Sequence, residues 1–180
     1  KFINAPLYTT SHQVGHILAA LYSVNRLDLI NQEFIAFHVS GGTTEALLVK
    51  PDKDEIIKAE IIAESLDLKA GQAVDRTGVM LGMTFPCGKE LDAISQKSEK
   101  NYKIKPTMLN GDCSLSGVEN KARNMIDKGE SAQDVAKFVL TYIAETVSSM
   151  LGGVVQKYGD LPVVFSGGVA SNSLLRKIIN

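Results

Sequence analysis

The sequence has no excess of charge of one sign and no long uninterrupted apolar run. Lysine and arginine number 19 against 20 acidic residues, a net charge of −1, so no overall basic field draws the chain to nucleic acid or to an anionic membrane. A local basic patch or a partner could still supply contacts to RNA. No apolar run approaches the length of a membrane span, and residues 1–6 do not form a signal peptide. We therefore expect a cytoplasmic protein with no membrane contact.

Cysteine is scarce too. Cys87 and Cys113 stand far apart and form no C-x-x-C pair, which favours two reduced cytosolic thiols, although spacing alone leaves a disulfide open. The composition, 44% hydrophobic and 22% charged in 180 residues, is that of an ordinary globular domain. The sequence lacks an initiator methionine and stops at Asn180 inside an apolar helical pattern, so we expect a fragment of a longer chain.

The apolar periodicity predicts an α/β layered domain. A helix over 11–27 precedes a three-stranded meander, and helices dominate until a last strand and helix. Residues 97–112 are polar and are expected to form a mobile loop, and Gly152-Gly153 is expected to kink a long helix or admit another backbone. The strands are predicted over 34–40, 45–50, 55–63 and 162–165, and the later helices over 68–81, 89–96, 116–128, 131–158 and from 171 onward.

Two Ser-Gly-Gly turns follow apolar strands, at Ser40-Gly41-Gly42 and at Ser166-Gly167-Gly168. Glycine lets a phosphate approach the backbone, where consecutive N–H groups can converge on it. The second turn also opens a helix, whose N-terminus attracts anions. A plain hairpin turn and a helix cap, with Ser171 or Asn172 as the cap, are the alternatives. Two such turns in one domain favour nucleotide binding, although neither is a Walker A loop.

His12 and His16 are spaced i, i+4 on the first predicted helix, so both imidazoles lie on one face, a spacing suited to a transition metal. Two histidines on the surface or against a partner helix are an equally good interpretation. A metallopeptidase of the H-E-x-x-H type is disfavoured, because Gln13 follows His12 and cannot act as a general base.

Two acidic residues, Asp67 and Asp75, lie two helical turns apart. A carboxylate in a nucleotide cleft accepts hydrogen bonds from ribose hydroxyls or holds the water shell of a metal. The alternatives are that Asp75 pairs with a neighbouring base or with solvent, and that Asp67 caps the helix. The Pro86-Cys87-Gly88 turn that follows can bring a ligand against bare backbone.

The order of these motifs resembles the TsaD/Gcp family, also called the glycoprotease or O-sialoglycoprotein endopeptidase family. The motifs are H-x-x-x-H, V-S-G-G, E-S-x-D-x-x-A-G-x-A-x-D, F-P-x-G, S-x-S-G and S-G-G-V-x-x-N, and they cover residues from about 6 to 180. The resemblance implies an actin-like (ASKHA) ATPase fold, of which this chain holds essentially one lobe. Residues 1–30 would form the metal-motif helix and inter-lobe connection, and residues 31–180 a nucleotide-binding lobe truncated at both ends.

The resemblance also implies a function. Family members transfer threonylcarbamoyl from its adenylate to N6 of a tRNA adenosine, with a bound iron or zinc ion that helps to hold the adenylate. ATP or threonylcarbamoyl-adenylate, Mg²⁺, tRNA and a TsaB-like actin-fold partner are the ligands and partners it suggests. By resemblance His12 and His16 match metal ligands, with a third ligand, an aspartate, beyond Asn180. The residues that match nucleotide contacts are His38, Val39, Ser40, Gly41, Gly42, Asp75, Gly88, Asp92 and Asn172.

The chain departs from the family pattern inside these motifs. Val14 replaces a glutamate between the histidines, Thr43 replaces a histidine after S-G-G, and Pro86-Cys87-Gly88-Lys89 replaces P-G-G-P. The turn glycines are retained better than the chemical side chains, so nucleotide binding is better supported than catalysis. A non-catalytic nucleotide-binding paralogue or partner subunit is therefore the alternative to a transferase, and a metallo-glycoprotease is a third, less favoured one.

Overall fold

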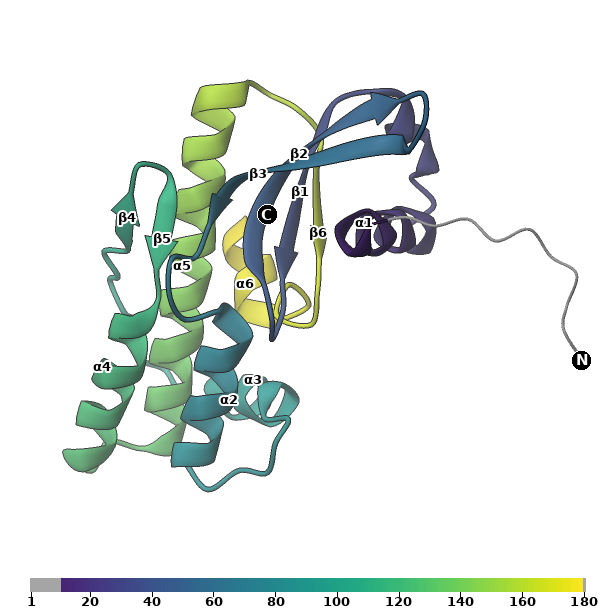
Figure 1. Cartoon of the computed structure of the whole chain (residues 1–180). Coiled ribbons are helices and arrows are strands. Elements are labelled where there is room, and N and C mark those ends of the chain that lie inside the picture. Colours follow the sequence, from purple (N-terminus) through teal and green to yellow (C-terminus); the bar gives the residue numbers. More distant parts are fainter. Residues whose placement is uncertain (1–10, 180) are drawn as a thin grey trace, which may run out of the picture.

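A computed structural model describes residues 11–179 as a mixed sheet between two helical layers (Figure 1). The first ten residues of the predicted segment 1–30 lie outside the described residues. The sheet has the order β3-β2-β1-β6, with β6 parallel to β1 and the other neighbours antiparallel. The elements are α1 (His12–Ser23), a 3-10 helix η1 (Leu27–Asn31), β1 (Phe34–Val39), β2 (Thr44–Asp52), β3 (Ile56–Glu64), α2 (Ala70–Met80), α3 (Gly88–Ser95), β4 (Thr107–Leu109), β5 (Asp112–Ser114), α4 (Ser116–Asp127), α5 (Ala132–Tyr158), β6 (Val163–Ser166) and α6 (Ser173–Ile179).

The central strands β1 and β2 are buried on both faces of the sheet, which explains why β1 is an almost continuous apolar run. Ile35, Phe37 and Val39 pack into the core shared with α5, whereas Phe34 and Ala36 pack against α1. Helix α1 fits its side of the sheet because its buried residues fall on one stripe, and the Ser11 hydroxyl caps its first turn. The predicted α/β layers and the meander are confirmed.

Helix α5 is long and apolar enough to cross a membrane by length and composition, contrary to our expectation for the sequence. Its packing instead indicates a core helix, because 61% of its most apolar stretch is buried inside the fold. It forms the central helix of the larger core, with α3, α4 and α6 against it (Figure 1). Gly152-Gly153 does not interrupt the helix, which continues through both, and no backbone of residues 11–179 approaches either glycine, contrary to the second expectation for this pair.

Two further expectations are corrected. Residues 97–112 are not all loop, because β4 pairs with β5 in a short antiparallel hairpin. The sequence did not predict this hairpin because it has little apolar periodicity, and only Cys113 among its residues is buried. Asp67 does not cap α2, the helix that follows it in the sequence. Its carboxylate instead accepts hydrogen bonds from the amides of Leu115 and Ser116, at the start of α4.

Candidate nucleotide and metal site

The two Ser-Gly-Gly turns lie side by side, because β1 and β6 are parallel neighbours that end at the same edge of the sheet. Gly167 has φ +99°, and a Cβ there would clash with the carbonyl oxygen of Val39. That same carbonyl accepts hydrogen bonds from the amides of Val169 and Ala170, at 3.1 and 3.3 Å. The second turn is therefore fixed onto the end of β1, and only glycine fits at its contact point.

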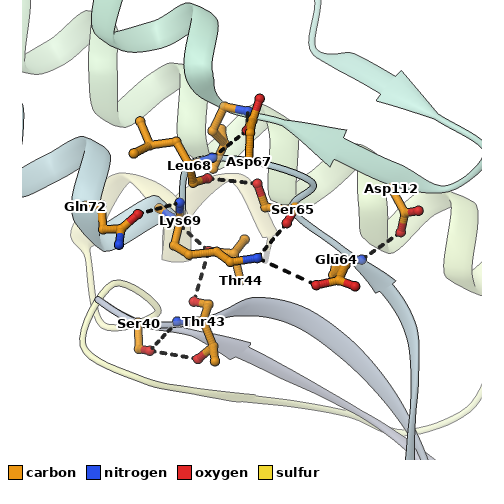
Figure 2. A network of polar contacts seen from close by, with 12 residues as sticks. Ser40, Thr43, Thr44, Glu64, Ser65, Asp67, Leu68, Lys69, Gln72 and Asp112 are labelled. Carbon is orange, nitrogen blue, oxygen red and sulfur yellow. Dashed lines mark hydrogen bonds and ion pairs between the residues drawn. The ribbon is translucent and has the colours of Figure 1, made fainter.

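The first turn is closed by its own polar groups (Figure 2). The Ser40 amide donates to the Thr43 carbonyl at 2.8 Å, and the Ser40 and Thr43 hydroxyls are 2.8 Å apart. Gly41 and Gly42, between them, are exposed. Neither of their amides has a backbone acceptor within residues 11–179, so both are available to an anion.

The start of α2 rests on this first turn. The Gly71 amide donates to the Ser40 carbonyl at 3.0 Å, and the Ala70 amide donates to the Thr44 hydroxyl at 2.8 Å. A Cβ on Gly71 would lie 2.5 Å from the Cα of Gly41. We did not identify Gly71 as a site residue from the sequence. The Ala70-Gly71 pair of the acidic motif is the feature that could have indicated it.

Beside these turns lies a cleft of about 440 Å³, within the range of small-molecule sites. Five of the predicted nucleotide contacts line it: Gly41, Asp75, Gly88, Asp92 and Asn172. The other four do not. Val39 is fully buried beneath the turns, Ser40 and Gly42 belong to the first turn, and His38 lies against the histidines of α1.

Asp75 lines this cleft, and Cys87 lies behind it. One Asp75 oxygen accepts the Cys87 amide at 2.8 Å, which ties α2 to the start of α3. The Cys87 side chain is buried against Gly78, so it packs inside the wall. Asp75 and Gly41 also border a second cavity of about 630 Å³, to which Arg76 and the exposed Phe85 contribute. Sequence reasoning missed this cavity.

Asp92 and Asn172 have structural partners at the other end of the cleft. Asp92 accepts hydrogen bonds from the Ser173 hydroxyl at 2.6 Å and the Ser173 amide at 3.2 Å. The Asn172 side chain accepts the amides of Leu174 and Leu175, which makes it the cap of α6. We expected the amides at the start of α6 to be free to bind an anion. Most of them instead donate hydrogen bonds to Asp92 and Asn172.

The three histidines of the chain, His12, His16 and His38, form one cluster. The Nε2 atoms of His12 and His16 are 3.1 Å apart, and the rings of His16 and His38 are 4.8 Å apart. Burial, then the charges of His16 and His12, lowers the pKa of His38, which favours the neutral imidazole that binds metals. Within residues 11–179 no three His, Cys, Asp or Glu side chains already surround a single point.

The residues that depart from the family pattern have structural roles. Val14 is 3% exposed and packs against the sheet, and the Thr43 hydroxyl closes the first turn. Cys87 fills the space over Gly78. At positions 14 and 43 the side chain supports the fold where the resemblance implied a glutamate and a histidine, and at position 87 it packs where the family pattern has a glycine.

Comparison with known sequences gives consistent matches over nearly the whole chain. The TsaD family profile, described as tRNA N6-adenosine threonylcarbamoyltransferase, matches residues 2–180. Curated proteins of that name from Enterococcus faecalis and Streptococcus sanguinis are 34% and 31% identical over 96% of this chain. The chain spans about half the length of these relatives, 50% and 52% respectively.

Solved structures share the fold at low sequence identity. HypF from T. kodakarensis has a TM-score of 0.70 at 16% identity, covering 98% of this chain and 32% of its own. The activator of 2-hydroxyisocaproyl-CoA dehydratase from Clostridium difficile, solved with bound ADPNP, has a TM-score of 0.53 at 18% identity, covering 91% of this chain and 55% of its own. These likenesses confirm the actin-like (ASKHA) α/β fold.

Proposed function

The chain belongs to the TsaD family of tRNA N6-adenosine threonylcarbamoyltransferases, and from this premise we propose that it forms the adenylate-binding lobe of such a transferase. The observation that carries the proposal is the joining of two Ser-Gly-Gly turns at one edge of a cleft of about 440 Å³. The exposed Gly41 and Gly42 amides would hold the phosphate of ATP or of threonylcarbamoyl-adenylate.

The rest of the cleft suits a nucleoside. Asp75 would accept hydrogen bonds from ribose hydroxyls through the oxygen that Cys87 does not use. A Cβ added at Gly88 would have only a distant contact, to Val74, so the space beside this residue is open. The ligand could therefore approach the bare backbone of Gly88. Asp92 would act mainly by holding α3 to α6 at the far end, and Asn172 by capping α6. Mg²⁺ would accompany the phosphates of ATP rather than a protein cage.

The proposed reaction is an acyl transfer to tRNA. The adenosine N6 amine attacks the carbonyl carbon of the threonylcarbamoyl group, the bond from that carbon to the phosphate oxygen breaks, AMP leaves, and the amine proton passes to solvent. The lobe would contribute mainly by positioning the adenylate, and its amides would stabilise negative charge on the phosphate.

His12 and His16 would hold an iron or zinc ion. Their Nε2 atoms lie 3.1 Å apart, close enough to bind one ion, and both side chains reach solvent. When bound, such an ion would supply positive charge near the acyl phosphate. The tRNA and a TsaB-like actin-fold partner would bind the complete cytoplasmic protein. This chain spans half the length of its relative from Enterococcus faecalis.

A second candidate is a nucleotide-binding paralogue that does not transfer. The structural roles of Val14, Thr43 and Cys87 favour it, because these are the positions where the family carries other groups. The older name of the family suggests a metallopeptidase, which Gln13 after His12 disfavours.

One set of assays on the protein with its partners separates these functions. Threonylcarbamoyl-adenylate and unmodified tRNA are supplied, and modified adenosine is measured, with ATP and AMP titrations alongside. Modified tRNA supports the transferase, and nucleotide binding without it supports the paralogue. Failure to bind either nucleotide would overturn both. The peptidase requires peptide cleavage that His12→Ala and His16→Ala abolish.

A further inference from the structure

The second cavity, of about 630 Å³, shares Gly41 and Asp75 with the nucleotide cleft and has no other lining residue in common with it. The rest of its wall comes from α2, from α4 and from Phe85 in the loop before α3. Helices α2 and α4 pack against each other (Figure 1). The turn after β1 therefore borders two spaces, and the adenylate of the proposed function would occupy one of them.

A transfer reaction needs room for a second substrate beside the first. In the proposed reaction an amine attacks the carbon bonded to the adenylate phosphate, which the Gly41-Gly42 amides would hold. The amine must therefore enter from a space that also borders this turn. The second cavity borders it at Gly41, and its volume is within the range of small-molecule sites. This cavity thus suits the acceptor of the acyl group.

Phe85 supplies an exposed aromatic side chain to the wall of the second cavity. The residue is 70% exposed, and Val79, which lines the same cavity, is exposed too. Exposed apolar groups that gather at one hollow mark ligand or partner sites. An exposed ring suits a base of single-stranded RNA, because bases stack on aromatic side chains whatever their identity.

Two arginines add positive charge to the same wall. Arg76 of α2 and Arg123 of α4 lie 2.9 and 3.5 Å from the carboxylate of Glu119. One carboxylate balances only one of the two guanidinium groups, and both arginine side chains are more than half exposed. Asp75, the remaining charged residue of the wall, is at the boundary with the cleft. Guanidinium groups bind phosphate oxygens in pairs, so this wall suits a phosphodiester.

We propose that the second cavity receives the acceptor nucleotide of a single-stranded RNA segment, with its base stacked on Phe85 and its phosphate bound by Arg76 and Arg123. This inference rests on the proposed transfer to tRNA and adds to it the residues that bind the acceptor. Glu119 keeps both arginines at the wall while no RNA is bound. Because such exposed ion pairs are weak, the phosphate can replace the carboxylate at little cost.

Binding of a labelled RNA to the full chain tests the stacking contact without the transfer reaction. The probe is a fluorescent single-stranded RNA of about eight nucleotides that contains adenosine, and its anisotropy is measured. Phe85→Ala should weaken binding by about 5- to 100-fold, whereas Phe85→Tyr, which keeps the ring, should stay within about twofold. Tyr22→Ala removes a similarly exposed ring from α1 and is the matched control, with affinity expected within about twofold of the wild type.

The contribution of the arginines should appear in the salt dependence of the same binding. Arg76→Gln and Arg123→Gln should each lower the slope of log K against log salt by about 0.7, the loss of one phosphate contact to a single strand. Arg26→Gln is the control, because Arg26 is similarly exposed and is paired with Asp28. Glu119→Gln should strengthen RNA binding by about two- to fivefold, since it frees both guanidinium groups. A residue that served only the fold would not improve binding when changed.

The outcomes separate this inference from the proposed function. If the wild-type chain binds ATP but not the RNA, or if Phe85→Ala and both arginine variants bind the RNA like the wild type, the inference is overturned and the nucleotide cleft stands. Saturating AMP should leave the RNA bound. Competitive displacement by AMP would show that the RNA occupies the nucleotide cleft instead, which also overturns the inference. Failure to bind ATP and AMP would overturn the proposed function itself.

Discussion

A Cβ on Gly71 would lie 2.5 Å from the Cα of Gly41, because the first turn of α2 rests directly on the turn that follows β1. The contact is backbone against backbone, so no flexible side chain can move aside. The contact fixes the position of the Gly41-Gly42 amides relative to Asp75, which lies one helical turn after Gly71 in α2. The geometry of the cleft thus depends on two glycines that are 30 positions apart in the sequence.

Gly71→Ala should therefore separate α2 from the turn. We expect a loss of about 1–3 kcal/mol in the free energy of unfolding and at least about a tenfold weaker ATP affinity, since shifts at the phosphate-facing amides weaken hydrogen bonds to the ligand. Urea denaturation and ATP titration of the same protein measure both. Gly152→Ala is the control, because open space surrounds Gly152 in α5. Alanine there should raise stability by up to about 1 kcal/mol, and an equal loss in both variants would contradict the argument.

Much of the fold could be predicted from the sequence because its signals are local. The apolar run of β1, the Ser131 cap of α5 and the stripe on α1 each follow from periodicity or capping chemistry. The β4–β5 hairpin was missed because its residues are mostly polar and it is held by a partner across the turn. The membrane-like hydropathy of α5 likewise reflects tertiary burial.

The candidate site could be predicted only in part, because residue type does not say what a group already binds. Asp92 and Asn172 were found as cleft residues, yet both are occupied by the start of α6. His38 was assigned to the phosphate turn, whereas its strand position turns it toward α1.

Asp75→Asn should separate the charge of this carboxylate from its role in the wall. The amide keeps an oxygen that can accept the Cys87 N–H, so the stability should change by less than about 0.5 kcal/mol. The loss of charge-assisted hydrogen bonds to ribose should weaken AMP binding by about 10- to 100-fold. Calorimetric titration with AMP measures this. Asp127→Asn, at the end of α4, should bind AMP like the wild type, and unchanged affinity in both variants would remove Asp75 from the ribose site.

Val14→Glu restores the residue that the family pattern carries between the two histidines, and here it should be destabilising. Val14 is 3% exposed in the layer between α1 and the sheet, so a glutamate would bury a charge at a cost of about 2–4 kcal/mol. Ala19→Glu adds the same charge on the exposed side of α1 and should cost less than about 0.5 kcal/mol. Thermal unfolding in the presence of a chelator compares them. A neutral Val14→Glu would show that this end of α1 can rotate toward solvent.

Asp67 should make stability depend on acid pH. Burial alone would raise the pKa of this carboxyl, but hydrogen bonds donated by Ser114, Leu115 and Ser116 outweigh that effect and lower it from 3.8 to about 2. A depressed folded pKa gives stability that is complete above about pH 4 and is lost as the pH falls toward 2. Because the residue is exposed, we expect only about 1 kcal/mol. Asp67→Asn should therefore be less stable than the wild type at pH 7, and the gap should narrow between pH 4 and pH 2 in urea denaturation. A gap that stays constant across this range would show that Asp67 acts through packing at the start of α4 and not through its charge.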